Sequence, residues 1–219
     1  MTDSSFDSPE NGTSRRDFLV LGALAGAALL LPSLPASAAF GYGDTRHLRF
    51  LEELQNLQAD FFTKAALSAT NDGLSEREMN IFNLIAKQDA EQARWFAKAR
   101  QRYGIAAFDK SYTSNLSVSR VTPEYHYPRN TFQTRAEMFA RAIEIKETAV
   151  GAFHGVVIRA SDDKIVESVA SLAGVQNRHL AALKELSGQN PLTAYVEATT
   201  PRAAANKLTA YKFKSEALD

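Results

Sequence analysis

Polar side chains interrupt the apolar faces of four predicted helices, and these interruptions are where the sequence could do chemistry. Burying such groups without hydrogen-bond partners is unfavourable, so we expect them to meet at one site in the centre of the protein. Because the chain has no cysteine, a metal ion at that site would need carboxylates and imidazoles as ligands. The interruptions are Gln55 and Gln58, Gln88 and Glu91, Glu147, and Gln176 and His179.

Hydrophobic periodicity predicts the helices that position these residues, at about 45–68, 75–103, 131–160 and 161–188. Each helix also begins with a start signal. These signals are Asp44 as an N-cap, the capping boxes Ser75 to Glu78 and Thr134 to Glu137, and the acidic pair Asp162 and Asp163.

The connections between the helices predict how they are arranged. The first and second helices are joined by a short link, as are the third and fourth, and short links join antiparallel neighbours. The stretch 105–130 is long and polar, as expected for a crossover that runs the length of a bundle. We therefore predict an all-α, ferritin-like four-helix bundle over residues 39–190. A tail at 191–219 should contain a short helix from Pro201 to about Tyr211.

The first 38 residues have the organisation of an export signal. Ser14-Arg15-Arg16-Asp17-Phe18-Leu19 resembles the twin-arginine consensus, and an uncharged run follows as far as Leu31. The small residues of Ala36-Ser37-Ala38 predict cleavage after Ala38. The apolar run is shorter than the roughly 20 residues of a spanning helix, so we expect a periplasmic protein without a stable membrane anchor.

The charge balance limits the classes of partner. The whole chain carries 25 basic and 25 acidic residues, and residues 1–38 contain more acidic than basic side chains. The mature chain is therefore close to neutral, which argues against nucleic acid as a partner. The charge balance is compatible with a protein partner or a homo-oligomer. The basic, aromatic stretch 207–214 could contact a membrane surface or a partner, or be a solvated helix end.

Three segments resemble the bacterial ferritin-like domain family of the desiccation-related type. Residues 50–62, 147–153 and 173–179 are similar to its first-, third- and fourth-helix signatures. The resemblance implies a di-metal site built from a glutamate on each of two helices and a Glu-x-x-His pair on each of the other two.

Half of the ligand set implied by the resemblance is changed in this chain. Gln55 stands at the first-helix glutamate, Arg94 at the second-helix histidine and Gln176 at the fourth-helix glutamate, whereas Glu91, Glu147 and His179 are retained. We therefore expect no cofactor, with a single iron or manganese ion on the three retained residues as the alternative. A shift of one helical turn would instead involve Gln58, Asp60 or Glu144.

Two functions remain open at this stage. The first is a non-enzymatic bundle with a degenerate di-metal site, acting as a structural, binding or envelope-stress protein in the periplasm. The second is a metalloprotein that uses the remnant site for oxidase, peroxidase-like or metal-storage activity.

Overall fold

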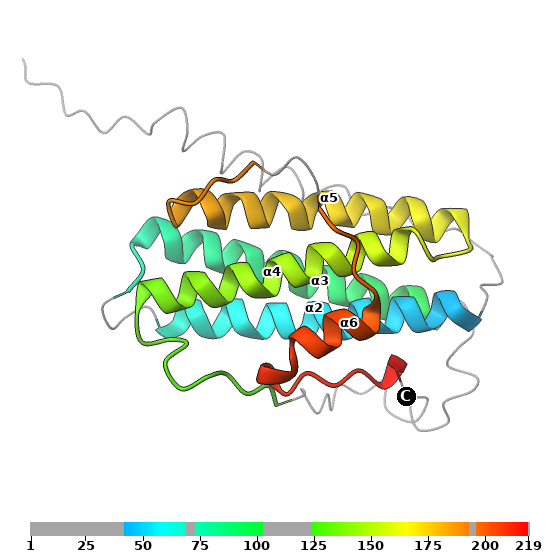
Figure 1. Ribbon diagram of the computed structural model, residues 1–219, viewed down its shortest axis with the longest axis horizontal. Helices are drawn as coiled ribbons and strands as arrows, with labels where there is room; N and C mark the ends of the chain where they lie inside the picture. The colour runs from blue at the N-terminus through cyan, green and yellow to red at the C-terminus, as the bar shows by residue number, and fades with distance from the viewer. Residues whose placement is uncertain (1–41, 69–72, 103–123, 193–195, 219) are drawn as a thin grey trace, which may run out of the picture.

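Four long helices dominate the computed structural model, which describes residues 42–68, 73–102, 124–192 and 196–218. They are α2 (Tyr42–Ser68), α3 (Glu76–Arg102), α4 (Arg135–Val157) and α5 (Asp163–Leu186), and they lie side by side along the longest axis of the molecule (Figure 1). The export-signal prediction and most of the predicted crossover lie outside the described residues.

The helices pack as two hairpins, α2 with α3 and α4 with α5. The hairpins meet through contacts of α2 with α4 and of α3 with α5, so α3 and α4 lie on a diagonal of the bundle. The long connection from α3 to α4 joins these two diagonal helices. The all-α ferritin-like fold predicted from the sequence is confirmed.

Local capping explains where three of the helices begin. At the start of α3 the Glu78 backbone N–H donates to the Ser75 hydroxyl, and the Glu78 carboxylate accepts from the Ser75 backbone N–H, which is the predicted capping box. Thr134 accepts from the Glu137 N–H at the start of α4. Asp162 accepts from the second and third residues of α5 in the same way.

Asp44 has a different role from the predicted N-cap. Helix α2 already begins at Tyr42, so Asp44 lies in its first turn, where it is buried. Its carboxylate accepts hydrogen bonds from the backbone N–H groups of Ser161 and Asp162, at 2.9 and 3.0 Å, and from the Ser161 hydroxyl at 2.6 Å. Asp44 therefore ties the start of the first helix to the turn between α4 and α5.

The tail packs onto the outside of α4 and α2. It contains α6 (Pro201–Lys207) and two short 3₁₀ turns, η3 (Thr209–Tyr211) and η4 (Glu216–Leu218). Of the stretch 207–214, the rings of Tyr211 and Phe213 are buried, whereas the three lysines are exposed. The Phe213 ring meets the Phe50 ring of α2 edge-on at 6.1 Å.

Two glycines of α4 allow the tail to cross this helix closely. The Thr199 N–H donates to the Gly151 carbonyl oxygen at 2.8 Å. A Cβ atom at Gly151 would lie 2.7 Å from the Thr199 hydroxyl, and one at Gly155 would overlap the Thr199 carbonyl oxygen. Because these two positions have no side chain, an extended segment of the tail backbone can lie directly on the helix.

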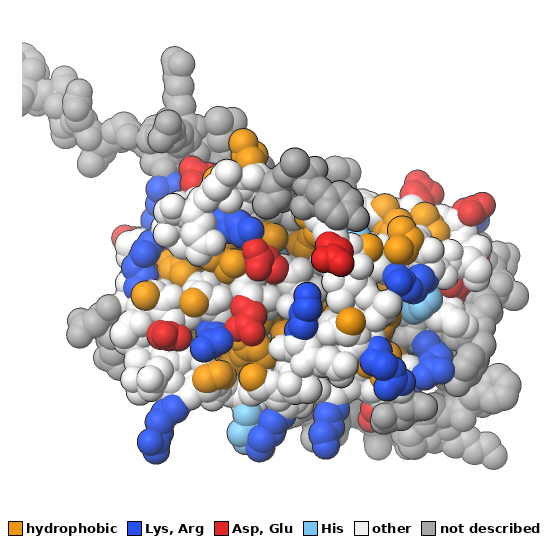
Figure 2. Space-filling view, in the orientation of Figure 1, with side chains coloured by type: hydrophobic (Ala, Val, Ile, Leu, Met, Phe, Trp, Pro, Cys, Tyr) orange, Lys and Arg blue, Asp and Glu red, His pale blue; other side chains and the backbone are white. Residues whose placement is uncertain are grey.

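The exterior of the described part of the chain is mixed in character. Basic and acidic side chains are interspersed over the face shown in Figure 2. In the described residues, no helix has the length and apolar character needed to cross a membrane.

Candidate functional site

Eight polar side chains meet in the middle of the bundle, and all of them are almost completely inaccessible to solvent. Helix α3 supplies three of them, α2 and α5 two each, and α4 one. This central polar cluster consists of Gln55 and Gln58, Gln88, Asp89 and Gln92, Lys146, and Gln176 and His179.

Lys146 is the hub of the central polar cluster. Its ammonium nitrogen lies 2.8 Å from each carboxylate oxygen of Asp89, 2.7 Å from the Gln176 amide oxygen and 3.2 Å from Nδ1 of His179. It also lies 5.2 Å from the centre of the Phe62 ring. An ammonium group has three N–H donors, so these partners satisfy it fully.

The contacts of His179 define its tautomer. Nδ1 faces the Lys146 ammonium, which can only donate hydrogen bonds, so Nδ1 is the acceptor. Nε2 then carries the proton and donates to the Gln88 amide oxygen at 2.5 Å. His179 is therefore a neutral imidazole held between two fixed partners.

A chain of amide groups extends the cluster from α5 to α2. Gln176 donates to the amide oxygen of Gln92 at 2.8 Å, and Gln55 donates to the same oxygen. Gln58 in turn donates to the Gln55 amide oxygen at 2.8 Å. The hydrogen bonds thus link all four helices at one level.

Burial governs the ionisation of the three titratable groups. It raises the pKa of the Asp89 carboxyl, against the opposing effect of Lys146. It lowers the pKa of Lys146 to about 8, although Asp89 favours the charged form. Burial, followed by the charges of Lys146 and Arg178, holds the pKa of His179 well below 6.5. The close contact of Lys146 with Asp89 is that of an ion pair, and beside a neutral His179 it leaves the cluster without net charge.

Six residues of the cluster have the same distribution over the helices as the ligands of a ferritin-like di-metal site, with one residue on each of two helices and an i, i+3 pair on each of the other two. Gln55 on α2 and Lys146 on α4 occupy the single-residue positions. Asp89 and Gln92 on α3 form one i, i+3 pair, and Gln176 and His179 on α5 form the other. This chain therefore has buried polar side chains at six such positions, but most of them are not the glutamates and histidines of a di-metal ligand set.

These residues do not fit a metal ion. Only the Asp89 carboxylate and the His179 imidazole are good ligands for iron or manganese, and the Lys146 ammonium is hydrogen-bonded to both. A divalent cation would meet the positive charge of Lys146 at close range. Within the described part of the chain, no three histidine, aspartate or glutamate side chains are grouped so that they could share a metal ion.

The structure does not bring together the three residues that the sequence assigned to a remnant metal site. Glu91 lies on the outside of α3 with 58% of its side chain exposed, where it pairs with Arg94. Glu147 is 50% exposed and pairs with Lys184 of α5 at 2.6 Å. Only His179 lies in the cluster, so the placement of Glu91 and Glu147 in the core was wrong.

Gln55 and Gln176 do lie in the core, where they make the hydrogen bonds described above. Sequence reasoning missed Asp89, Gln92 and Lys146. One signal could have found two of them, because Asp89 and Gln92 have the same i, i+3 spacing as Gln176 and His179.

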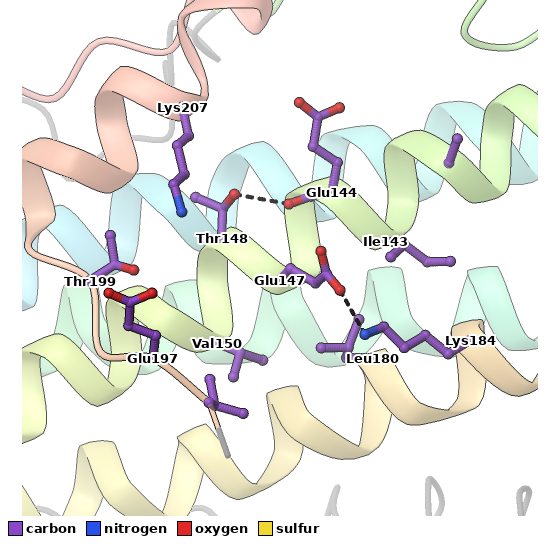
Figure 3. A pocket seen from close by; sticks show the side chains of 12 residues that line it. Ile143, Glu144, Glu147, Thr148, Val150, Leu180, Lys184, Glu197, Thr199 and Lys207 are labelled. Carbon is purple, nitrogen blue, oxygen red and sulfur yellow. Dashed lines mark hydrogen bonds and ion pairs between the residues drawn. The ribbon is translucent and has the colours of Figure 1, made fainter. Parts of the chain in front are cut away.

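A separate pocket of about 530 Å³ lies on the surface between α4, α5 and the tail. Figure 3 shows charged side chains around it: Glu144 and Glu147 from α4, Lys184 from α5, and Glu197 and Lys207 from the tail. Glu147 thus faces a solvent-accessible pocket that could take a small polar ligand. Neither Glu147 nor any other residue of this pocket belongs to the central polar cluster.

Comparison with known proteins agrees with the four-helix architecture. The family model described as the ferritin-like domain matches residues 43–189, which include all four long helices. No curated protein and no solved structure matches the chain. The four-helix topology and the matched length together place this chain in the ferritin-like domain family.

Proposed function

We propose that this chain is an exported, metal-independent member of the ferritin-like domain family with a non-catalytic structural or binding role in the periplasm. The observation that carries the proposal is the Lys146 ammonium, which lies at a metal-ligand position and is hydrogen-bonded to Asp89 and His179. A protonated lysine supplies the positive charge that carboxylate-rich bundles obtain from metal ions.

The hydrogen bonding of the cluster supports a structural role for the bundle centre. The three donors of Lys146 and both nitrogens of His179 have partners, and the amide groups of Gln176 and Gln92 bond to one another. Although the Gln58 amide oxygen has no hydrogen-bond partner among the described residues, a network satisfied at these groups fixes the register of the four helices. A binding role would instead use the surface pocket beside Glu147 and Lys184.

Metal analysis of the protein purified from the periplasm without chelator tests the proposal. We expect far less than one iron or manganese per chain, and the same melting temperature with added iron, added manganese or a chelator. One or two metal ions per chain, lost on chelation together with thermal stability, would support the metalloprotein alternative and overturn this proposal.

The export part of the proposal rests on the twin-arginine segment and on the small residues before Ala39. Replacing both Arg15 and Arg16 by lysine should retain the protein in the cytoplasm as the uncleaved chain. The unaltered protein should be recovered from the periplasm with Ala39 at its N-terminus. Equal periplasmic recovery of the two proteins would contradict the assigned route.

A role in envelope stress follows from the resemblance to the desiccation-related type. It predicts that cells lacking the gene survive drying or osmotic shock less well than cells carrying it. Complementation with the Arg15→Lys, Arg16→Lys chain would then fail, because the protein would be in the wrong compartment. Equal survival of all strains would remove stress from the proposal.

A further inference from the structure

Lys146, Gln176 and Asp89 are arranged as a nucleophile, an acyl group and a proton carrier. The Lys146 nitrogen lies 2.7 Å from the amide oxygen of Gln176, and it is the carbonyl carbon bonded to this oxygen that an amine would attack. One oxygen of Asp89, Oδ1, lies 2.8 Å from the Lys146 nitrogen and 3.0 Å from the Gln176 amide nitrogen. A single carboxylate oxygen therefore touches both the attacking and the leaving nitrogen.

We propose that Lys146 and Gln176 form an intramolecular isopeptide bond that links α4 to α5, with Asp89 transferring the protons. A lysine amine is a nucleophile only when neutral, and transfer of its proton to Asp89 within the buried pair produces that form without any outside base. The three side chains have no exposed surface, so bulk water does not compete for the acyl group.

The proposed reaction balances without an oxidant or a co-reactant. The Lys146 ammonium first gives one proton to Asp89, and its nitrogen attacks Cδ of Gln176. Asp89 carries a second proton from the Lys146 nitrogen to the Gln176 amide nitrogen, the Cδ–Nε2 bond breaks, and ammonia leaves. The product is a secondary amide beside a neutral Asp89 carboxyl, so charge is conserved.

Burial favours this product over the starting side chains. An ion pair in an apolar interior has lost its hydration, whereas a secondary amide and a carboxylic acid carry no net charge. The new amide N–H stays beside Asp89 and keeps a hydrogen-bond partner. The fixed positions of the groups also remove most of the entropic barrier to a reaction between two side chains.

The intact mass of the denatured full-length protein tests the bond directly. We expect the folded protein, once purified, to weigh less than its sequence by one ammonia molecule. Proteolysis should then yield a branched peptide that joins the segments around Lys146 and Gln176. A folded, helical protein with its full sequence mass would overturn the proposal. Loss of one water, mapped to Lys146 and Asp89, would overturn the assignment of Gln176 as the acyl group.

Two variants test the assigned roles, each compared with its own sequence mass. Asp89→Asn keeps a hydrogen-bonding side chain of the same size but cannot carry the protons, so we expect its full mass. Glu91→Gln changes only the exposed pair with Arg94 and should still lose ammonia. Persistence of the bond in Asp89→Asn would contradict the proton-transfer role of Asp89. The intact mass of the unaltered chain decides the main proposal even if this variant folds poorly.

Discussion

Before it bonds to Gln176, Lys146 holds a positive charge at a depth where lysine is rarely found without a carboxylate partner. Its pairing with Asp89 leaves the centre of the bundle neutral, and the Gln176 amide accepts from Lys146 and donates to Asp89. Each side chain of the cluster therefore depends on its neighbours. Removal of one partner leaves another buried and unsatisfied, which is the most damaging kind of polar substitution.

Lys146→Met should lower the free energy of unfolding by about 3–5 kcal/mol, because it removes both the counter-ion of Asp89 and the side chain proposed to bond to Gln176. The double variant Lys146→Met, Asp89→Asn should recover a substantial part of this loss, since no charge then remains in the core. Urea unfolding of the two single variants and the double variant measures the coupling. Additive losses would show that the two side chains do not act as a pair.

His179 predicts a loss of stability in mild acid. The pKa of His179 in the folded protein lies well below 6.5, whereas in the unfolded chain it has the usual value of a histidine. In mild acid the unfolded chain therefore binds a proton at this residue and the folded chain does not. This residue should therefore lower the free energy of unfolding by up to about 1.4 kcal/mol per pH unit as the pH falls below the unfolded pKa.

Urea unfolding at about pH 7 and about pH 5 measures this effect. In His179→Gln the side chain cannot take up a proton, but it can still donate to Gln88 and accept from Lys146. This variant should lose less stability in acid than the unaltered protein. The same loss in both proteins would show that other groups cause the acid sensitivity.

At the scale of the element, the sequence predicted most helix boundaries. It predicted only for some helices which face points into the bundle. Capping signals are local, and α3 and α5 begin at or next to the residues that the sequence indicated, whereas α4 begins at Arg135, directly after the capping residue Thr134 and not at about residue 131. The inward faces of α2 and α5 were also predicted, because Gln55 and Gln176 are flanked by apolar residues at helical spacing.

The faces of α3 and α4 were misplaced around the site because polar residues are adjacent there. Gln88, Asp89, Glu91 and Gln92 all lie within about one turn, and Lys146 is followed directly by Glu147. Periodicity alone cannot choose among neighbouring polar positions. The choice depends on the partners that each side chain finds across the bundle, and lysine is the residue least expected inside.

The crossing of the tail over α4 is a second feature of this scale, and it depends on glycine. Gly155→Ala should destabilise the protein by about 1–3 kcal/mol, because the added methyl group would overlap the Thr199 backbone. Gly174→Ala in α5 is the matched control, since its Cβ would meet only Arg178 at 3.8 Å.

The control should be neutral or stabilising by about 0.5–1 kcal/mol, as is usual when alanine replaces glycine inside a helix. Thermal unfolding of both variants provides the comparison. A destabilised Gly174→Ala together with an unaffected Gly155→Ala would contradict the close crossing of α4 by the tail.

At the scale of the whole molecule, the ferritin-like framework is retained although its centre has changed. The six positions that converge on the centre differ from a di-metal set mainly at Gln55, Gln92, Lys146 and Gln176. The framework should therefore accept metal again if the ligands are restored.

A variant with Gln55→Glu, Gln92→His, Lys146→Glu and Gln176→Glu should bind about two iron or manganese ions per chain. Without metal its clustered carboxylates repel one another, so its melting temperature should lie below that of the unaltered protein and rise on addition of metal. Metal analysis and thermal unfolding test both expectations. A variant that folds but binds no metal would show that the helices no longer hold ligand geometry.

The packing of the tail on α2 has a consequence for the order of events during synthesis. Arg46 on the first helix donates to the carbonyl oxygen of Ala217 at 2.7 Å, and Phe50 packs against Phe213. During synthesis, α2 emerges from the ribosome long before Phe213 and Ala217 have been made. The growing chain must therefore carry an uncovered apolar strip on α2 until Phe213 and Ala217 have emerged, and only then can the tail pack against this helix.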